Sequence, residues 1–135
     1  MDLFPKHCVL VVDDDPSIRR LLVVTLRRQG YQTLEACNGR EALAAMRAGS
    51  PDIVIMDLVM PEVSGWDVLR ERAADRSLLR IPMIVVTASN THKARVDVLE
   101  KQVCGVIAKP FDLDTVLTTL RDCLENPSVL APVAA

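Results

Sequence analysis

The sequence predicts a doubly wound α/β domain with a five-stranded parallel sheet and five helices. Short runs rich in Val, Leu and Ile alternate with longer segments in which apolar residues recur every three or four positions. Continuously apolar strands between amphipathic helices indicate a parallel sheet that is covered on both faces. A chain of 135 residues has the length of one ordinary domain.

The first strand and helix show this alternation most clearly. Residues 8–12 form an apolar, β-branched run that ends in three aspartates, which is typical of a buried strand. Residues 16–29 have apolar side chains at helical spacing. This helix is predicted to begin with Asp15 as N-cap and Pro16 at its first position, and to end at Gly30.

The same pattern continues to residue 124. The next predicted elements are a strand at 32–36, a helix at 40–48 closed by Gly49, a strand at 53–56 that ends at Asp57, and a helix at 65–75. They are followed by a strand at 83–86 that ends at Thr87, a helix at 91–101, a short strand at 106–108 that ends at Lys109, and a helix at 112–124 capped by Asp112. Right-handed crossovers between parallel strands leave few topologies for this order of elements.

The end of the chain differs from the rest in composition. Residues 126–135 contain two prolines and no charged residue. We therefore expect the domain to span residues 1–125, and residues 126–135 to form a flexible tail or the stub of a linker.

Composition excludes several classes of function. The formal net charge of −2 argues against a strongly basic nucleic-acid binder. Aromatic residues make up 3% of the chain, so base stacking on single-stranded nucleic acid is disfavoured. No apolar run approaches the roughly 18 residues that a membrane span needs.

The N-terminus and the cysteines suggest a cellular location. The first residues include Asp2 and no apolar stretch, so no signal peptide is expected and the protein is predicted to be cytoplasmic. The four cysteines form no C-x-x-C pair, which argues against zinc. We expect them to be reduced in that compartment. They are Cys8, Cys37, Cys104 and Cys123.

Polar side chains gather where the predicted strands end. Because the carboxyl ends of parallel strands meet at one edge of a sheet, residues that follow the strands should lie close together. These residues are Asp13 and Asp14 after the first strand, Asp57 after the third, Thr87 after the fourth and Lys109 after the fifth. The second strand ends in Glu35 and Ala36 and is expected to contribute nothing comparable.

The charges at this edge predict a metal site. Three carboxylates and one ammonium group carry a formal charge of about −2. Carboxylates this close raise one another's pKa unless a cation joins them. Mg²⁺ fits best, because it accepts one or two carboxylates together with waters and a phosphate oxygen. Asp15 is assigned mainly to capping the following helix.

Four motifs occur in order at the strand ends. They are Val-Leu-Val-Val-Asp-Asp-Asp-Pro at 9–16, Ile-Val-Ile-Met-Asp-Leu-Val-Met-Pro at 53–61 with Gly65, Val-Val-Thr-Ala at 85–88 and Ala-Lys-Pro-Phe at 108–111. Over about residues 7–125, the chain resembles the receiver domain of bacterial two-component response regulators. The resemblance implies a flavodoxin-like fold with strand order 2-1-3-4-5 and a function in phosphorelay signal transduction.

The resemblance also implies roles for the acidic residues. Asp57 matches the phosphoacceptor, which takes a phosphoryl group from the phosphohistidine of a histidine kinase. Asp14 matches the acid that binds Mg²⁺ directly, together with Asp57 and the backbone carbonyl of Val59. Asp13 matches the acid that usually acts on the metal through water.

Two more residues match groups that contact the phosphoryl oxygens. Thr87 corresponds to the hydroxyl residue, and Lys109 to the lysine that pairs with the same group. Lys109 is followed by Pro110, where the family commonly has a cis peptide. Phosphoryl transfer needs positioning and charge neutralisation more than covalent work by the protein, which suits a lysine as a compact charge.

Three positions are expected to set switching and signal lifetime. Val106 stands at the switch position, where family members often carry an aromatic ring that turns inward when Thr87 engages the phosphate; the small side chain precludes that rotamer change. In receivers, the side chains two residues after the acceptor and two after the hydroxyl residue flank the approach of the hydrolytic water. The resemblance assigns these positions to Val59 and Ser89, and neither is an acid or an amide. We therefore expect slow autodephosphorylation. Gln102 stands where receivers usually have the glycine that closes their fourth helix.

Two other functions compete with a phosphoacceptor domain. A small Mg²⁺ phosphohydrolase usually carries its aspartyl nucleophile after the first strand and has a cap domain, for which 135 residues leave no room. A pseudo-receiver, which is an interaction module without phosphorylation, usually lacks an acid or the lysine, and this chain keeps them all.

The leading prediction implies partners but no separate enzymatic substrate. The chain would be an enzyme only in catalysing its own phosphorylation and dephosphorylation. Its partners would be a sensor histidine kinase or a phosphotransfer protein, and a downstream protein or an output domain outside this chain. A homodimer through the 91–124 face is a further expected partner, whereas direct binding to nucleic acid or membrane is not expected.

Overall fold

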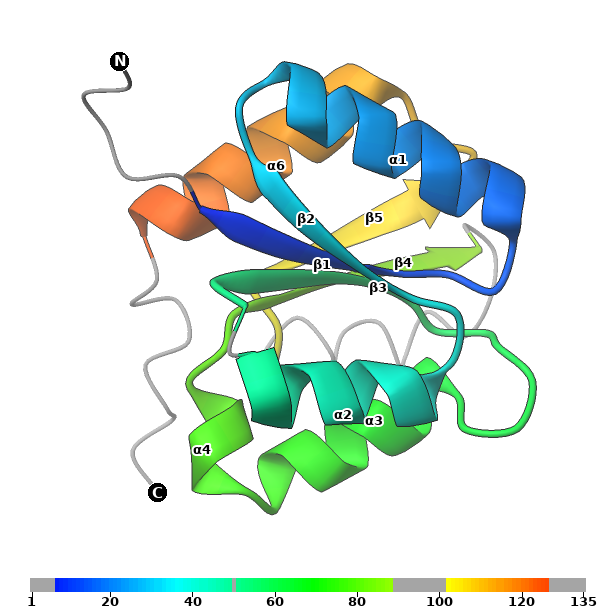
Figure 1. Cartoon of the computed structure of the whole chain (residues 1–135), viewed down its shortest axis with the longest axis vertical. Helices are drawn as coiled ribbons and strands as arrows, with labels where there is room; N and C mark the ends of the chain where they lie inside the picture. Colours follow the sequence, from blue (N-terminus) through cyan, green and yellow to red (C-terminus); the bar gives the residue numbers. More distant parts are fainter. Residues whose placement is uncertain (1–6, 50, 89–101, 127–135) are drawn as a thin grey trace.

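The computed structural model describes residues 7–49, 51–88 and 102–126. In these residues, five parallel strands form one sheet with helices on both faces (Figure 1). The strands are β1 (Cys8–Val12), β2 (Gln32–Ala36), β3 (Ile53–Asp57), β4 (Met83–Ala88) and β5 (Gly105–Lys109). The helices are α1 (Pro16–Arg28), α2 (Gly39–Gly49), α3 (Gly65–Ala73), α4 (Arg76–Leu79) and α6 (Leu113–Glu125).

The strand order in the sheet is β2-β1-β3-β4-β5, which confirms the predicted order. After β1 the chain crosses to one side of the sheet to form β2, and it then returns past β1 to form β3. The connections after β1 and β3 therefore diverge, which in open α/β sheets leaves a crevice at the carboxyl ends of these two strands. The predicted acidic residues lie at this edge.

Each face of the sheet has its own apolar core. Leu10 and Val12 of β1 pack in the core beneath α2, α3 and α4, whereas Val9 and Val11 pack in the core beneath α1 and α6 (Figure 1). All five residues of β3 are buried. Burial on both faces explains why the central strands have continuous apolar runs instead of an alternating pattern.

The predicted caps of α1 and α6 are present. The Asp15 carboxylate accepts hydrogen bonds from the backbone N–H groups of Ser17 and Ile18, at 2.8 Å and 3.3 Å. Gly30 follows α1 with a φ of 93°, a left-handed conformation that glycine adopts without steric cost. Asp112 caps α6 through the backbone N–H of Thr115 at 2.7 Å. Local side-chain chemistry therefore determines these helix ends.

Some predicted boundaries need correction. The helix expected at 65–75 ends at Ala73, and the separate turn α4 follows it. Asp75 causes the break, because its carboxylate accepts hydrogen bonds from the N–H and hydroxyl of Ser77 and so caps a new helical turn. The helix expected at 91–101 and most of the tail expected at 126–135 lie outside the described residues.

The prediction that all four cysteines are reduced is wrong for two of them. Cys104 and Cys123 form a disulfide, with their Cα atoms 5.8 Å apart. Cys8 and Cys37 are free thiols. The bonded pair is separated by 19 positions in the sequence, and the packing of α6 against β5 brings the two residues within bridging distance. Spacing along the chain could not show this proximity.

Candidate functional site

Four adjacent strands place the predicted site residues at one edge of the sheet. Val12 pairs with Met56, so Asp13, the residue after β1, lies beside Asp57 at the end of β3. Asp57 pairs in turn with Val86, the residue before Thr87 in β4. In the next pair of strands, Ala88 is opposite Lys109. The expected convergence of Asp13, Asp57, Thr87 and Lys109 therefore follows from the register of the sheet.

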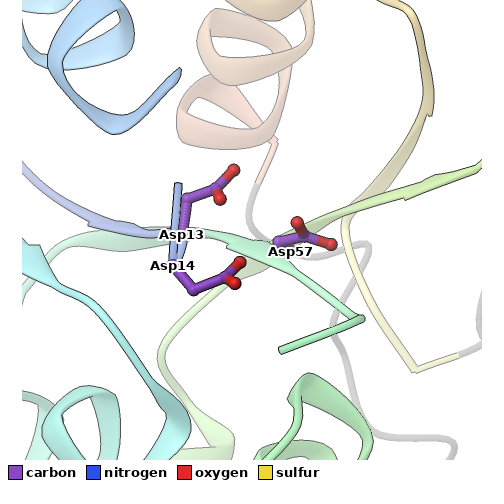
Figure 2. Close-up of side chains that lie close together, drawn as sticks. All are labelled: Asp13, Asp14 and Asp57. Atoms are coloured by element: carbon purple, nitrogen blue, oxygen red, sulfur yellow. The ribbon is translucent and has the colours of Figure 1, made fainter. Parts of the chain in front are cut away.

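The three acidic side chains form a tight cluster (Figure 2). One carboxylate oxygen from each of Asp13, Asp14 and Asp57 lies within 4.8 Å of the others. Asp13 and Asp57 are 3% and 6% exposed, whereas Asp14 is exposed to solvent. Two of the three charges are thus removed from water, which makes their mutual repulsion stronger than it would be on an open surface.

Lys109 supplies one positive charge to this cluster. Its Nζ lies 2.7 Å from Asp57 Oδ2 and 3.8 Å from Asp13 Oδ2. Burial acts to lower the pKa of the lysine, but the hydrogen bond to Asp57 and the charges of the three aspartates raise it above its ordinary value. Lys109 therefore stays protonated at neutral pH.

Asp13 carries the electrostatic cost of the cluster. Burial raises the pKa of its carboxyl group, and repulsion from Asp57 and Asp14 adds to the increase. A hydrogen bond from the N–H of Asp15 at 2.9 Å and the charge of Lys109 act in the opposite direction without cancelling it. With one lysine facing three carboxylates, the site has a surplus of negative charge.

The donor set of this site fits a divalent cation such as Mg²⁺. Asp57 Oδ1 accepts a hydrogen bond from the Val59 N–H at 3.0 Å, so the carboxylate is held in place by Val59 on one oxygen and by Lys109 on the other. Asp14 makes no hydrogen bond or ion pair within the described residues. Hard oxygen ligands with surplus negative charge are the set that Mg²⁺ prefers.

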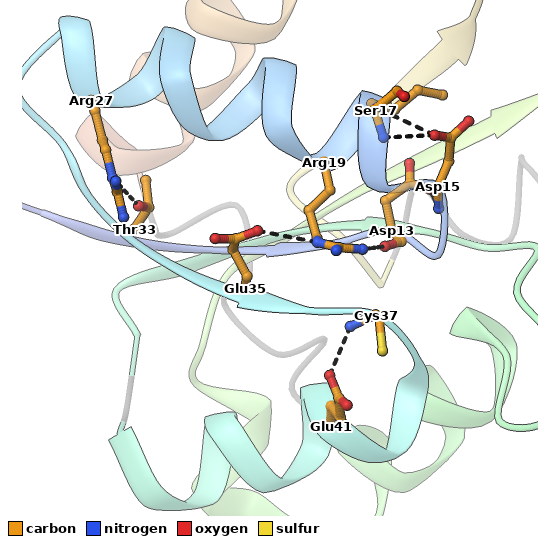
Figure 3. A network of polar contacts seen from close by, with 10 residues as sticks. Asp13, Asp15, Ser17, Arg19, Arg27, Thr33, Glu35, Cys37 and Glu41 are labelled. Atoms are coloured by element: carbon orange, nitrogen blue, oxygen red, sulfur yellow. Dashed lines mark hydrogen bonds and ion pairs between the residues drawn. The ribbon is translucent and has the colours of Figure 1, made fainter.

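An arginine that sequence analysis did not single out supports the acidic loop (Figure 3). The Arg19 guanidinium donates a 2.7 Å hydrogen bond to the backbone carbonyl of Asp13 and a 3.1 Å hydrogen bond to the Glu35 carboxylate. Glu35 lies on β2, which was expected to contribute nothing comparable to the site. Glu35 is not part of the acidic cluster, and β2 adds only an indirect contact that orients Arg19. The pairing of β1 with β2 was the signal that could have revealed it.

Gly65 allows α3 to begin directly behind the central aspartate. A Cβ atom at this position would lie 2.6 Å from the backbone oxygen of Asp57 and 2.7 Å from the Cα of Leu58. The Gly65 N–H donates to the Leu58 carbonyl at 3.0 Å. Any larger residue would push the start of α3 away from β3, and the loop that holds Asp57 and Val59 would shift with it.

The remaining predicted residues lie near the cluster or outside the described chain. Thr87 is 7% exposed, and the Lys109–Pro110 peptide is cis, as the resemblance implied. Val59 is 68% exposed at the mouth of the site. Val106 is partly buried against the core beneath α2 and α3. Ser89, the second residue expected to flank the hydrolytic water, lies outside the described residues.

The fold and the acidic crevice together define a doubly wound α/β domain whose site lies at the carboxyl ends of its parallel strands. The family model of the response regulator receiver domain matches residues 9–121. The chain therefore belongs to the receiver domain family of two-component response regulators, whose domains act in phosphorelay signalling.

Curated relatives agree with this assignment. The chain is 37% identical over 123 residues to the transcriptional regulatory protein KdpE of Mycobacterium tuberculosis, a match that covers 91% of this chain and 53% of KdpE. It is 34% identical over 116 residues to protein PilH of Pseudomonas aeruginosa, covering 86% of this chain and 96% of PilH. The chain thus spans about half the length of KdpE and nearly all of PilH.

Solved structures share the fold. The chemotaxis response regulator CheY4 of Vibrio cholerae superposes with a TM-score of 0.79 at 30% identity, covering 87% of this chain and 98% of CheY4. A response regulator receiver protein from Pseudomonas putida superposes with a TM-score of 0.79 at 28% identity, covering 89% of this chain and 99% of that protein's chain. Among the described residues, no helix combines the length and apolarity needed to cross a bilayer.

Proposed function

We propose that Asp57 accepts a phosphoryl group from the phosphohistidine of a sensor histidine kinase or a phosphotransfer protein. The observation that supports this most directly is the position of Asp57. Its buried carboxylate lies inside an acidic cluster, and one of its oxygens is 2.7 Å from the Lys109 ammonium. A carboxylate oxygen of Asp57 attacks phosphorus, the bond from phosphorus to the histidine nitrogen breaks, and that nitrogen leaves with the bonding electrons.

We assign the metal ligands to residues at the ends of β1 and β3. Asp14 and Asp57 hold Mg²⁺ with carboxylate oxygens, Val59 contributes its backbone carbonyl, and Asp13 acts through a water molecule. Bound there, Mg²⁺ supplies positive charge to the phosphoryl oxygens. The surplus negative charge of the cluster supports this assignment, because repulsion among the carboxylates falls when a cation is present.

Two residues act on the transferred group itself. Before transfer, the Lys109 ammonium group donates a hydrogen bond to the Asp57 carboxylate. After transfer, the same group neutralises an oxygen of the new phosphate. The Thr87 hydroxyl, at the end of the neighbouring strand, donates to another phosphoryl oxygen. Both residues stand next to Asp57 through the sheet register, so they meet the product with little rearrangement.

This reaction makes the chain a signalling domain that modifies only itself. The phosphohydrolase alternative would place the nucleophile after β1, but the residues after β1 do not contact Lys109 as closely as Asp57 does. In the pseudo-receiver alternative, an acid or the lysine would be missing from the cluster, whereas this chain has all four residues there. We therefore assign a cytoplasmic phosphorelay function with a downstream protein partner or an output domain, and a homodimer through the 91–124 face as one route to output.

We further propose that the phosphorylated state is long-lived. Val59 is 68% exposed at the mouth of the site, and its branched apolar side chain can neither donate a hydrogen bond to water nor accept one. A side chain that orients the hydrolytic water typically adds about 100-fold or more to such a step. Replacing Val59 with Asn should shorten the lifetime of phospho-Asp57 several-fold, as measured by loss of the phosphorylated mass, whereas Leu21→Asn on the exposed side of α1 should not.

The experiment that tests the proposal is phosphorylation by a small donor. Incubation with acetyl phosphate and Mg²⁺ should add one phosphoryl group, detected as an 80-dalton increase in intact mass, about the mass of HPO₃. The increase should disappear in Asp57→Asn and in wild type without Mg²⁺. Asp15→Asn, one residue beyond the cluster and still able to cap α1, serves as the matched control and should be phosphorylated normally.

Three results would contradict the proposal. Equal incorporation in wild type and Asp57→Asn would assign the acceptor to another residue. Equal incorporation with and without divalent metal would show that the acidic cluster does not need a cation. A folded wild-type protein that takes up no phosphoryl group from acetyl phosphate or from phosphoramidate would favour the pseudo-receiver function.

A further inference from the structure

The Cys104–Cys123 disulfide lies away from the acidic site. Cys104 immediately precedes β5, five residues before Lys109, and Cys123 lies in the last turns of α6. The N–H of Cys104 donates to the Met83 carbonyl at 2.8 Å, at the start of β4. The bond therefore joins the amino end of β5 to α6, at the end of the strand opposite Lys109.

The position of β5 depends on packing against α6 more than the position of the central strands does. β5 is an edge strand that pairs with β4 alone among the described strands. Its backbone approaches α6 closely, because a Cβ on Gly105 would lie 2.6 Å from the Thr119 methyl carbon. The disulfide crosses this contact, so it connects an edge strand covalently to the helix that covers it.

The two sulfurs differ in their access to solvent. Cys123 is 3% exposed and packs among apolar residues such as Leu120 and Ile107, whereas Cys104 is partly exposed. An external thiolate can therefore approach the Cys104 side of the bond. A reduced Cys123 would remain packed as a small apolar side chain, so both redox states suit the core.

We propose that Cys104 and Cys123 form a thiol–disulfide exchange site for small dithiols and glutathione-type thiols. A dithiol thiolate attacks the Cys104 sulfur, the bond to Cys123 breaks, and the Cys123 sulfur leaves with the electron pair and takes up a proton. The second thiol of the dithiol, or a second molecule of a glutathione-type thiol, then attacks the sulfur bound to Cys104, and Cys104 leaves with the electron pair and takes up a proton. Overall, one dithiol or two monothiols are oxidised to a disulfide, and the protein disulfide is reduced to two thiols with the transfer of two electrons and two protons.

Exchange at this site changes how firmly β5 and α6 are held together. Reduction removes the covalent link, so α6 is retained by packing alone and its amide groups exchange faster. Lys109 is expected to stay in place, because the pairing of Thr87 with Ala108 and of Ala88 with Lys109 does not involve the disulfide. The site therefore regulates the β5–α6 edge without depending on phosphorylation.

Counting thiols in the native protein tests the exchange step. After treatment with oxidised glutathione, denaturation and alkylation with N-ethylmaleimide, wild type should carry two alkyl groups, on Cys8 and Cys37. Treatment of the folded protein with dithiothreitol before alkylation should raise the number to four. Cys37→Ser, the matched control, should show one and then three, while Cys104→Ser should show three in both states.

Hydrogen exchange of unphosphorylated protein tests the consequence. Reduction of wild type should speed exchange in residues 105–107 and 113–125 by roughly 100-fold or more, the loss expected when a cross-link between residues 19 positions apart is removed. Exchange in α2 should not change. Cys104→Ser should behave like reduced wild type under oxidising conditions.

Three outcomes would overturn the proposal. Four alkyl groups after treatment with oxidised glutathione would mean that the bond does not form. Reduction that requires a denaturant would make the bond a fixed structural cross-link instead of an exchange site. Unchanged hydrogen exchange on reduction would show that it does not control the β5–α6 edge. None of these readouts uses phosphoryl transfer, so their failure is separate from a failure of the proposed phosphoacceptor function.

Discussion

Asp57 and Arg72 are both buried charged residues, 6% and 2% exposed, but their surroundings satisfy them in different ways. Asp57 lies at the carboxyl end of β3 with two other aspartates and a single lysine. Arg72 lies on α3 and reaches Ile81, just before β4, and Gln102, just before β5. One charge is therefore near the carboxyl ends of the strands and the other near the amino ends.

Arg72 is satisfied by neutral groups. Its guanidinium donates to the backbone carbonyls of Leu79, Ile81 and Gln102 at distances of 3.0–3.2 Å. Burial lowers its pKa to about 10, which still leaves it protonated at neutral pH. The bonds connect the end of α3 to α4, to the start of β4 and to the segment before β5.

The acidic site, in contrast, carries more negative than positive charge. Carbonyl dipoles can solvate the Arg72 charge in full, and no buried side-chain nitrogen or oxygen in the described residues lacks a partner. At the acidic site, one ammonium group faces three carboxylates, so the buried polar groups have hydrogen-bond partners while the charge is not balanced. The comparison shows that the two buried residues differ in charge balance more than in burial, which favours the acidic cluster over Arg72 as the candidate functional site.

The largest expected effect on the free energy of unfolding comes from removing the buried charge of Arg72, whose hydrogen bonds are made to backbone carbonyls. Arg72→Leu should lower the free energy of unfolding by about 3 kcal/mol or more, because three carbonyl oxygens lose their donor in a buried place. Urea denaturation measures it. Arg70→Leu on the same helix is the matched control: its side chain is 78% exposed and pairs with Asp67, so the loss should stay below about 1 kcal/mol. Equal losses in the two variants would mean that the buried bonds of Arg72 add little.

The second effect concerns the unbalanced charge. Mg²⁺ at about 100 times its Kd should raise the free energy of unfolding of wild type by about 2.7 kcal/mol through mass action. Asp14→Asn should lose most of this gain, while Asp15→Asn should keep it. Thermal denaturation over a series of MgCl₂ concentrations measures the difference. If Mg²⁺ stabilises Asp14→Asn as much as wild type, the cluster is not the metal site.

The third effect is the pH dependence of the metal-free protein. The pKa of Asp13 is raised in the folded protein, so its carboxyl group ionises at a lower pH in the unfolded chain than in the folded one. The free energy of unfolding therefore falls as pH rises from the ordinary aspartate pKa through the folded pKa. Asp13→Asn removes this loss and should be more stable than metal-free wild type at pH 7, by about 1 kcal/mol.

An aspartate with the opposite shift provides the control for that experiment. Hydrogen bonds from Ser77 lower the pKa of Asp75, so its contribution is present above the unfolded pKa and disappears as pH falls through the folded one. Asp75→Asn should therefore be less stable than wild type at pH 7. Denaturant titrations between pH 3 and pH 8 should give the two variants differences of opposite sign from wild type. The same sign for both would contradict the assignment of electrostatic cost to Asp13.

The smallest expected effect is on the Mg²⁺ affinity when the contact between Glu35 and Arg19 is weakened. Glu35→Gln removes the charge that compensates Arg19, so the guanidinium beside Asp13 should repel Mg²⁺ more strongly and raise its Kd about two- to three-fold, equivalent to well under 1 kcal/mol. Calorimetric titration with MgCl₂ can detect this change. Glu71→Gln, which removes an exposed partner of Arg47 on the other face, should leave the Kd unchanged. A larger change in Glu71→Gln than in Glu35→Gln would show that the Arg19 contact does not support the site.

Much of the site could be predicted from the sequence because it depends on where strands end. Apolar runs identify the strands, and parallel strands bring their carboxyl ends together, so Asp13, Asp57, Thr87 and Lys109 could be assigned to one place. The caps at Asp15 and Asp112 were also predictable, since they involve neighbours in the chain. These features follow from local patterns and from one general rule of topology.

Only the tertiary structure decided which distant groups contact or bond to one another. The carbonyls that surround Arg72, the bond from Arg19 to Asp13, and the Cys104–Cys123 disulfide join segments that are far apart or on different elements. Periodicity describes which face of an element is apolar, but it does not say where a long side chain ends or which two thiols meet. Those outcomes depend on the packing of α3, α6 and the edge strand, because contacts of a few ångströms are set by the relative positions of whole elements.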